Sequence, residues 1–261
     1  MELSLAGKTA LVCGASQGIG KAIAQELSAL GARCILLARN ESALKETVAS
    51  LSIQQKQDHL FYSVDFQNLE ELKKTAEKIS IEFEIDILIN NTGGPAPGPI
   101  ADADPAAFVT AFQQHLVCNQ ILAQAVVPSM KKNQWGRIIN VISTSVRIPI
   151  DNLGVSNTIR AAVASWSKTL SNELASFGIT VNSLLPGFIA TGRLDAVAEG
   201  FAKREGVSKT EMEAKMRNSV PAKRFGAPSE IAAVAAFVAS PAASYVNGIC
   251  IPVDGGRTGT I

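Results

Sequence analysis

Short apolar stretches alternate along this chain with segments in which apolar residues recur at every third or fourth position. A short apolar stretch between turn residues is typical of a buried strand, and the longer period is typical of an amphipathic helix. Unbroken runs of Val, Ile and Leu predict a parallel sheet that is covered on both faces. The predicted strands are 9–13, 34–38, 60–64, 85–89, 137–142, 179–185 and 249–253.

The predicted helices lie between these strands, so that strand and helix alternate to the end of the chain. Gly31 is expected to end the first helix, and Asn40 is expected to cap the second. This order predicts an α/β fold, in which residues 1–261 form a single Rossmann-type domain with a doubly wound parallel sheet and helices on both faces. The predicted helices are 20–30, 41–51, 69–83, 105–130, 156–177 and 229–239.

Residues 192–220 interrupt this alternation with a charged segment. We expect two short helices here, which form a flap over the substrate. The alternative for most of the charges in this segment is a solvated surface.

Composition restricts the partners and the compartment. The net charge of +1 provides no long-range attraction for nucleic acid or anionic membranes, and no apolar run approaches the ~20 residues that span a bilayer. Met1–Leu5 has no signal-peptide pattern, so we expect a cytoplasmic protein. The cysteines form no C-x-x-C pair, which favours reduced core thiols and predicts no metal site. They are Cys13, Cys34, Cys118 and Cys250.

A glycine-rich turn, residues 14–20 with the sequence GASQGIG, connects the first predicted strand to the first helix. Glycines let a backbone approach a pyrophosphate closely, and the following helix N-terminus presents free N–H groups to it. This context indicates a dinucleotide site, whereas the alternative is a tight turn without a ligand. The residues expected to bind here are Gly14, Ser16, Gln17, Gly18, Ile19 and Gly20.

The end of the second strand indicates which dinucleotide binds. A carboxylate there would hydrogen-bond the ribose 2′-hydroxyl of NAD, but this chain has Ala38 followed by Arg39. A guanidinium pairs with the 2′-phosphate of NADP. We therefore expect NADP(H) in preference to NAD(H); the alternative is that Arg39 is a solvated surface charge.

Further motifs extend over the whole chain and resemble one family. They are Asp65 after the third strand, the turn Asn90-Asn91-Thr92-Gly93, the strand and serine GRIINVIS at 136–143, the loop PGFIAT at 186–191, RFG at 224–226 and VDGG at 253–256. Together with the G-x-x-x-G-x-G spacing of the turn, they resemble the short-chain dehydrogenase/reductase family, and in particular its 3-oxoacyl-carrier-protein reductases.

The resemblance implies further cofactor contacts and a homo-oligomer, either a dimer or a tetramer. Asp65 stands where the family has an acid that contacts adenine. The other implied contacts come from two loops. One is the turn after the fourth strand, and the second is the loop after the sixth strand, whose backbone and threonine hold the nicotinamide carboxamide in the family. These residues are Asn91, Gly93, Pro186, Gly187, Ile189 and Thr191.

The catalytic positions depart from the family, which uses Ser, Tyr and Lys with an Asn on the preceding helix. Ser143 matches the serine. Thirteen residues later, at the tyrosine position, stands Ser156, and four residues after that, at the lysine position, stands Arg160. His115 occupies the Asn position. Neither tyrosine of the chain is followed four residues later by lysine, so a shifted alignment does not restore the motif.

These substitutions alter the expected acid–base chemistry. A serine hydroxyl is far less acidic than a phenol and is shorter, and arginine stays charged, so it can bind ribose or stabilise an oxyanion but cannot relay a proton. His115 is the candidate replacement donor, with Arg160 favouring its neutral form. The alternatives are a helix histidine bonded to the backbone for His115, a residue without a role for Ser156, and a surface or ribose-binding cation for Arg160.

Two functions follow for a small-molecule substrate. The first is an NADP(H)-dependent oxidoreductase that acts on a carbonyl or alcohol, including 3-oxoacyl compounds, with Ser143, Ser156, Arg160 and His115 as the catalytic residues. The second is a pseudoenzyme that binds the cofactor and acts as a sensor or interaction subunit. Dehydration or epimerisation on the same fold is a weaker third interpretation.

Overall fold

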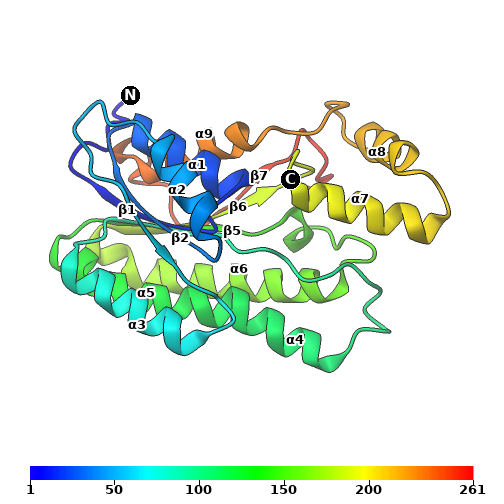
Figure 1. Ribbon diagram of the computed structural model, residues 1–261, viewed down its shortest axis with the longest axis horizontal. Helices are drawn as coiled ribbons and strands as arrows, with labels where there is room; N and C mark the ends of the chain where they lie inside the picture. The colour runs from blue at the N-terminus through cyan, green and yellow to red at the C-terminus, as the bar shows by residue number, and fades with distance from the viewer. Residues whose placement is uncertain (261) are drawn as a thin grey trace.

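The computed structural model describes residues 1–260 and contains a parallel sheet of seven strands (Figure 1). The strand order is β3-β2-β1-β4-β5-β6-β7, so the order reverses between β1 and β4. Each predicted strand is present, with ends that differ by one or two residues. The strands are β1 (Thr9–Cys13), β2 (Arg33–Ala38), β3 (Leu60–Ser63), β4 (Ile87–Asn90), β5 (Gly136–Val141), β6 (Ile179–Pro186) and β7 (Cys250–Val253).

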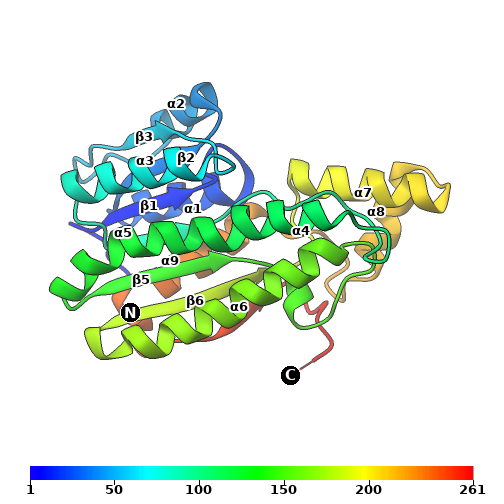
Figure 2. The same cartoon turned by 90° about the horizontal axis from the view of Figure 1, so that it is seen from below.

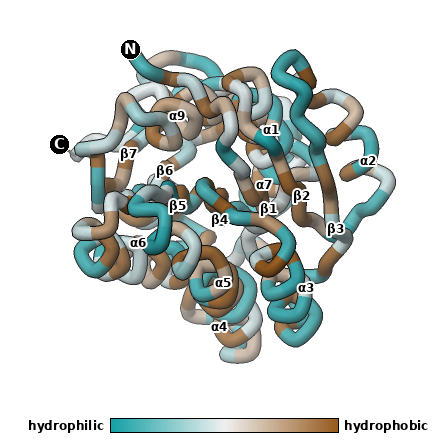
Figure 3. The backbone as a smooth tube through the Cα atoms, turned by 90° about the vertical axis from the view of Figure 1, so that its left-hand side faces the viewer, coloured by the Kyte–Doolittle hydropathy of each residue, from teal (hydrophilic) through white to brown (hydrophobic). Residues whose placement is uncertain are grey.

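Helices cover both faces of this sheet, which confirms the doubly wound Rossmann-type fold (Figure 3). One face carries α1 (Gly18–Ala29), α2 (Glu41–Ala49) and α9 (Pro228–Ala239). The other carries α3 (Leu69–Glu82), α5 (Cys118–Lys132) and α6 (Gly154–Leu174). The side chain of Asn40 accepts a hydrogen bond from Ala43 N and caps α2 as predicted, and Gly31, with φ +101°, follows the end of α1.

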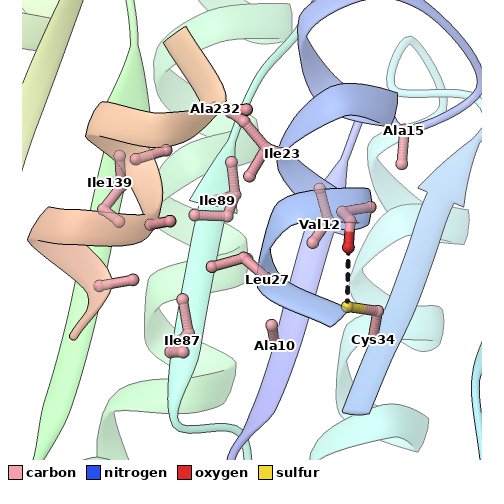
Figure 4. Close-up of a cluster of buried hydrophobic side chains, with 14 of the residues drawn as sticks. Ala10, Val12, Ala15, Ile23, Leu27, Cys34, Ile87, Ile89, Ile139 and Ala232 are labelled. Atoms are coloured by element: carbon pink, nitrogen blue, oxygen red, sulfur yellow. Dashed lines mark hydrogen bonds between the residues drawn. The ribbon is translucent and has the colours of Figure 1, made fainter. Parts of the chain in front are cut away.

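Side chains of each strand alternate between two apolar clusters, as the strand period requires. Val12 and Leu36 pack toward α1 and α9, whereas Leu11 and Leu37 pack toward α3 and α5. In Figure 4 the helix side chains Ile23, Leu27 and Ala232 lie against Val12, Ile89 and Ile139 of the strands, and the Cys34 thiol donates to the carbonyl of Ala24 at 3.5 Å.

The cysteines are free thiols, as the sequence predicts. Cys13, Cys34 and Cys118 are buried and Cys250 is half-buried. Burial raises the pKa of Cys34 to about 12, so it is a neutral core side chain at physiological pH. Within residues 1–260, none of the helices is both long and apolar enough to cross a membrane.

The long helix predicted over 105–130 is present, but one of its turns is not α-helical. The segment consists of α4 (Pro105–Phe112), a π-helical turn η1 (Gln113–Val117) and then α5. A π-turn inserts a residue into the helical repeat, which shifts the side chains on either side of it, and a pattern of apolar positions does not reveal a single such turn. The helix predicted at 156–177 likewise begins earlier, at Gly154, and ends at Leu174, where a 3₁₀ turn follows over Ala175–Phe177.

Residues 192–220 form the two short helices that were predicted, α7 (Gly192–Glu205) and α8 (Lys209–Asn218). They lie beyond one edge of the sheet in both Figure 1 and Figure 2. Charged side chains on their outer face form ion pairs such as Lys215 to Glu205 at 2.7 Å. The inner faces share a small apolar cluster of their own, so part of the segment is packed and part is a solvated surface, and the flap over a substrate stays a prediction. The cluster consists of Leu194, Ala198, Ala202, Met212 and Met216.

A substitution at the contact between α1 and α9 tests the assignment of the core. Leu27 is fully buried there, so we expect Leu27→Ala to lower the free energy of unfolding by about 2–5 kcal/mol, through lost transfer energy and the remaining cavity. Urea denaturation followed by circular dichroism measures this. The control Ile81→Ala, at a side chain that is 85% exposed, should change stability by less than about 0.5 kcal/mol; equal effects would contradict the assignment of the core.

Candidate functional site

The candidate site lies at the carboxyl ends of the strands, where the order reverses between β1 and β4. All strands are parallel, so the turns that follow them meet at one edge. The structure brings together there the glycine turn after β1, the loop after β4, the serine after β5 and the loop after β6.

The glycine turn has the geometry of a phosphate cradle. Gly14 and Gly18 have φ of +61° and +56°, a region that favours glycine. A Cβ on Gly20 would overlap the carbonyl oxygen of Gly14 and lie 2.8 Å from Asn91 Nδ2. The N-cap Gln17 of α1 makes no side-chain capping bond, so the N–H groups of the first turn keep their capacity for an anion. These residues fit a dinucleotide pyrophosphate.

The loop after β4 braces this turn. Asn91 Nδ2 is 3.4 Å from the carbonyl oxygens of both Cys13 and Gly14, to which it donates. From the loop after β6, the Cγ2 methyl of Thr191 lies 3.3 Å from where a Cβ on Gly18 would stand. Two of the expected cofactor residues therefore contact the turn itself.

The residues expected to contact the adenosine part of the cofactor follow the ends of β2 and β3. Arg39 is exposed, and its carbonyl oxygen accepts a hydrogen bond from Ser63 Oγ at 2.9 Å. The carboxylate of Asp65 accepts from Gln67 N at 3.0 Å. An exposed guanidinium held at this strand end fits a 2′-phosphate, as expected from the sequence.

The loop after β6 is fixed by backbone bonds. Gly187 N donates to Val253 O at 3.0 Å, and Ala190 N donates to Gly226 O at 2.8 Å. Ile189 is buried, so only its backbone can face a ligand. Thr191 caps α7 by accepting from Leu194 N at 3.4 Å. This loop therefore offers backbone groups and one hydroxyl, which suits the carboxamide of a nicotinamide.

His115 is buried within the π-helical turn η1, with 1% of its surface exposed. Its Nδ1 hydrogen-bonds to Thr92 Oγ1, so the interpretation of His115 as a histidine bonded to the backbone is wrong. Its Nε2 is buried and has no hydrogen-bond partner within residues 1–260. A buried ring nitrogen without a partner is costly in a native structure and calls for an explanation in function.

Arg160 is also buried, with 8% exposed, which excludes the interpretation as a surface cation. Its Nη1 donates to Val141 O at 3.0 Å and its Nη2 to Thr92 O at 3.3 Å. Thr92 thus joins the two substituted positions, since its side chain contacts His115 and its carbonyl accepts from Arg160. The sequence shows Thr92 only as part of the turn that resembles the family, and it was not among the expected site residues.

The charges in this cluster set the protonation of the histidine. Burial, followed by the cations Arg160 and Arg193, lowers the pKa of His115 to about 2. Burial, followed by Arg193, lowers the pKa of Arg160 to about 10, which leaves its guanidinium charged at neutral pH. The expectation that Arg160 favours neutral His115 agrees with the direction of this shift. An imidazolium is therefore not available as an acid near pH 7, but the neutral ring can donate a hydrogen bond.

The two serines come from the end of β5 and from the first turn of α6. Ser143 follows β5 and begins a 3₁₀ turn, in which its Oγ accepts from Ser145 N at 3.0 Å. Ser156 lies in the first turn of α6, is 8% exposed and precedes Arg160 by four residues, so the two share a face of the helix. The helix is tied to the sheet below the site, since Asn140 Nδ2 donates to Ser167 Oγ at 3.1 Å.

Arg193 is a site residue that sequence reasoning missed. It extends from the first turn of α7 to the loop after β4, where its Nη2 donates to Pro95 O at 2.6 Å. The sequence places it two residues after Thr191, in the segment expected to form the flap. Nothing in that charged segment distinguishes it from the exposed Lys203 and Arg204 of the same helix.

Comparisons with known proteins agree with this geometry. Residues 14–258 match the family model described as enoyl-(acyl carrier protein) reductase. The chain is 34% identical to the NADPH-dependent reductase BacG of Bacillus subtilis, with 97% of this chain and 99% of BacG covered. It is 35% identical to the 3-oxoacyl-[acyl-carrier-protein] reductase FabG of Vibrio cholerae, with coverage of 97% and 98%.

Solved structures give the same result. YwfH, an NADPH-dependent reductase involved in bacilysin biosynthesis, superimposes with a TM-score of 0.91 at 33% identity, with 97% of this chain and 99% of YwfH covered. L-sorbose reductase from Gluconobacter frateurii, complexed with NADPH and L-sorbose, gives 0.92 at 30% identity, and both chains are covered completely.

The buried His115 predicts a pH dependence of stability. The unfolded chain protonates this residue below about pH 6.5, whereas the folded chain does so only near pH 2. The contribution of neutral His115 to the free energy of unfolding is therefore complete above pH 6.5. It is lost as the pH falls below that value, by up to about 1.4 kcal/mol per pH unit. We expect His115→Asn to remove this slope in urea denaturation from about pH 4 to about pH 8. Identical slopes for both proteins would contradict a neutral buried His115.

Proposed function

The chain belongs to the short-chain dehydrogenase/reductase family, and from this premise we propose that it is an NADP(H)-dependent oxidoreductase that interconverts a carbonyl and an alcohol in a small molecule. The observation that carries the proposal is the convergence of a phosphate-cradling turn with Ser143, His115 and Arg160 at one edge of the sheet. BacG is an NADPH-dependent reductase, and L-sorbose reductase binds NADPH in its crystal structure.

The cofactor supplies the hydride when it is bound, and the protein supplies position and charge. The N–H groups of the turn at 14–20 bind the pyrophosphate, and Arg39 binds the 2′-phosphate. The backbone after β6 orients the nicotinamide. Asn91 keeps this arrangement rigid, because it ties the loop after β4 to the glycine turn.

The polar cluster stabilises the negative charge that develops on the substrate oxygen. Arg160 is a buried cation, and its charge acts strongly because little water surrounds it. In the tautomer with the proton on Nε2, His115 accepts from the Thr92 hydroxyl at Nδ1 and donates to the substrate oxygen. Ser143 provides a hydroxyl as a further donor. Neutral imidazole is a poor acid, so the proton that completes the alcohol comes from water.

The pseudoenzyme remains the second candidate, and the neutral state of His115 is the observation that favours it. Neither that ring nor Arg160 can relay a proton as a Tyr and Lys pair does. Ser156, whose side chain is much shorter than a phenol, does not replace it. A protein that binds NADPH tightly and turns over no carbonyl would have this second function.

We further propose that α7 and α8 cover the substrate and that 3-oxoacyl compounds are among the carbonyl substrates. Arg193 supports the first part, since it joins α7 to the loop after β4. The similarity to FabG, a 3-oxoacyl-[acyl-carrier-protein] reductase, supports the second.

Ser143→Ala and His115→Ala test the oxidoreductase. Each removes one donor to the developing oxyanion, so we expect kcat/KM to fall by about 10²–10³, with a smaller effect on the Kd of NADPH. Oxidation of NADPH, followed by its absorbance over a panel of ketones, aldehydes and 3-oxoacyl thioesters, measures this. Ser244→Ala, at an exposed position, is the matched control. Tight NADPH binding without turnover of any compound would favour the pseudoenzyme.

Arg39→Asp tests the cofactor preference. A carboxylate at this strand end repels the 2′-phosphate and hydrogen-bonds the ribose 2′-hydroxyl, so kcat/KM with NADPH should fall by about tenfold or more while that with NADH rises. Arg204→Asp makes the same charge change at the far end of α7. It should leave the ratio of kcat/KM with NADPH to kcat/KM with NADH unchanged. A ratio that Arg39→Asp does not alter would mean that Arg39 is a solvated charge.

A further inference from the structure

Three side chains from separate helical elements converge on four consecutive residues of the loop after β4. His115 from η1 contacts the hydroxyl of Thr92, and Arg160 from α6 donates to the carbonyl of the same residue. Arg193 from α7 donates to Pro95 O, and its Nη2 lies 3.1 Å from where a Cβ on Gly94 would stand. The loop therefore serves as a common anchor for one imidazole and two guanidinium groups.

The charge in this cluster is unbalanced. Neither Arg160 nor Arg193 pairs with a carboxylate within residues 1–260, and both give their hydrogen bonds to neutral backbone carbonyls. Arg160 is buried, and burying a cation without a counter-ion is costly. Arg193 is exposed, so a ligand can reach its guanidinium. After burial itself, Arg193 is a further cause of the lowered pKa of His115 and of Arg160. The site is therefore complementary to an anion.

The cofactor phosphates have partners elsewhere in the proposed binding mode, at the glycine turn and at Arg39, so the anion belongs to the substrate. Arg193 uses one hydrogen bond on Pro95 O and keeps most of its N–H donors. A guanidinium edge matches the two oxygens of a carboxylate. Uncharged sugars and esters offer this guanidinium no such charged pair.

We propose that the substrate is an oxo acid, in which a free carboxylate bound by Arg193 lies close to a ketone whose oxygen is bound by His115 and Arg160. This inference rests on the proposed function and names its substrate class. In the reduction, a hydride from NADPH bonds to the ketone carbon, the C=O π electrons pass to oxygen, and that oxygen takes a proton from water. The products are a hydroxy acid and NADP⁺, with the carboxylate unchanged.

The test compares acids with their methyl esters, which lack the negative charge. The pairs are 2-oxobutanoate, 3-oxobutanoate and 4-oxopentanoate with the corresponding esters, which place the ketone at increasing distance from the carboxylate. For at least one pair we expect kcat/KM for the acid to exceed that for the ester by about tenfold to a hundredfold, as for a hydrogen bond to a charged group. Arg193→Gln should lower this acid-to-ester ratio by about tenfold or more relative to the wild type, mainly by raising KM for the acid, and the intrinsic reactivity of each ketone cancels in that comparison.

The matched control is Arg204→Gln, which removes the same charge from an exposed position of the same helix and should leave the ratio unchanged. Arg193→Lys should restore part of the preference, because it restores the charge without the planar fork. The Kd of NADPH is measured for every variant. A loss of NADPH affinity in Arg193→Gln, with an unaltered ratio, would overturn the proposal and make Arg193 a cofactor ligand.

A binding measurement separates this inference from the proposed function. Calorimetry of 2-hydroxybutanoate and 3-hydroxybutanoate with the NADP⁺-bound protein does not depend on turnover. Turnover of the esters and acids at equal rates would support the oxidoreductase and overturn the oxo-acid inference. If no ketone is reduced, the proposed oxidoreductase activity fails. Weaker binding of a hydroxy acid to Arg193→Gln than to the wild type would still support the carboxylate site. Equal binding to both proteins would overturn it.

Discussion

The parallel pairing of β1 with β4 is the constraint on which the rest of the structure depends. Their register joins Ala10 to Ile87 and Val12 to Ile89, and both strands are buried between helices. Because the strand order reverses here, the connections leave in opposite directions and open a crevice at the carboxyl ends. The glycine turn, with the helix start at Gly18, and the loop after β4 are neighbours for this reason, although 70 or more residues separate the two segments in the chain.

Two departures from regular structure supply the chemistry at that edge. The π-turn η1 places His115 among buried groups, and the loop after β4 presents the hydroxyl and carbonyl of Thr92 to it and to Arg160. A π-turn weakens the helical hydrogen-bond ladder, and such turns are frequent at functional sites. The buried Nε2 of His115 and the buried guanidinium of Arg160 have the same character, because each costs stability when it has no ligand or counter-ion.

Cofactor binding and catalysis depend on different parts of the candidate site. The cofactor region consists of backbone geometry, namely positive φ at Gly14 and Gly18 and fixed N–H groups, and it resembles the family closely. The catalytic region depends on side chains whose protonation the surroundings determine. Ser156 and Arg160 stand where the family has a Tyr and Lys pair, and Arg160 adds a buried positive charge in place of a proton relay, which is the basis of the proposed electrostatic stabilisation and anion binding.

The sequence by itself determined the strands, their parallel arrangement, the dinucleotide turn and the positions of Ser143, Ser156, Arg160 and His115. These features depend on local periodicity and on motif spacing, which a chain carries in its order of residues. Only the tertiary structure decided that Arg160 is buried, that Thr92 joins it to His115, that a π-turn divides the helix predicted at 105–130, and that Arg193 belongs to the site. Those facts depend on burial and on contacts between distant segments, and a pKa or a hydrogen-bond partner exists only after folding has removed the water around each group.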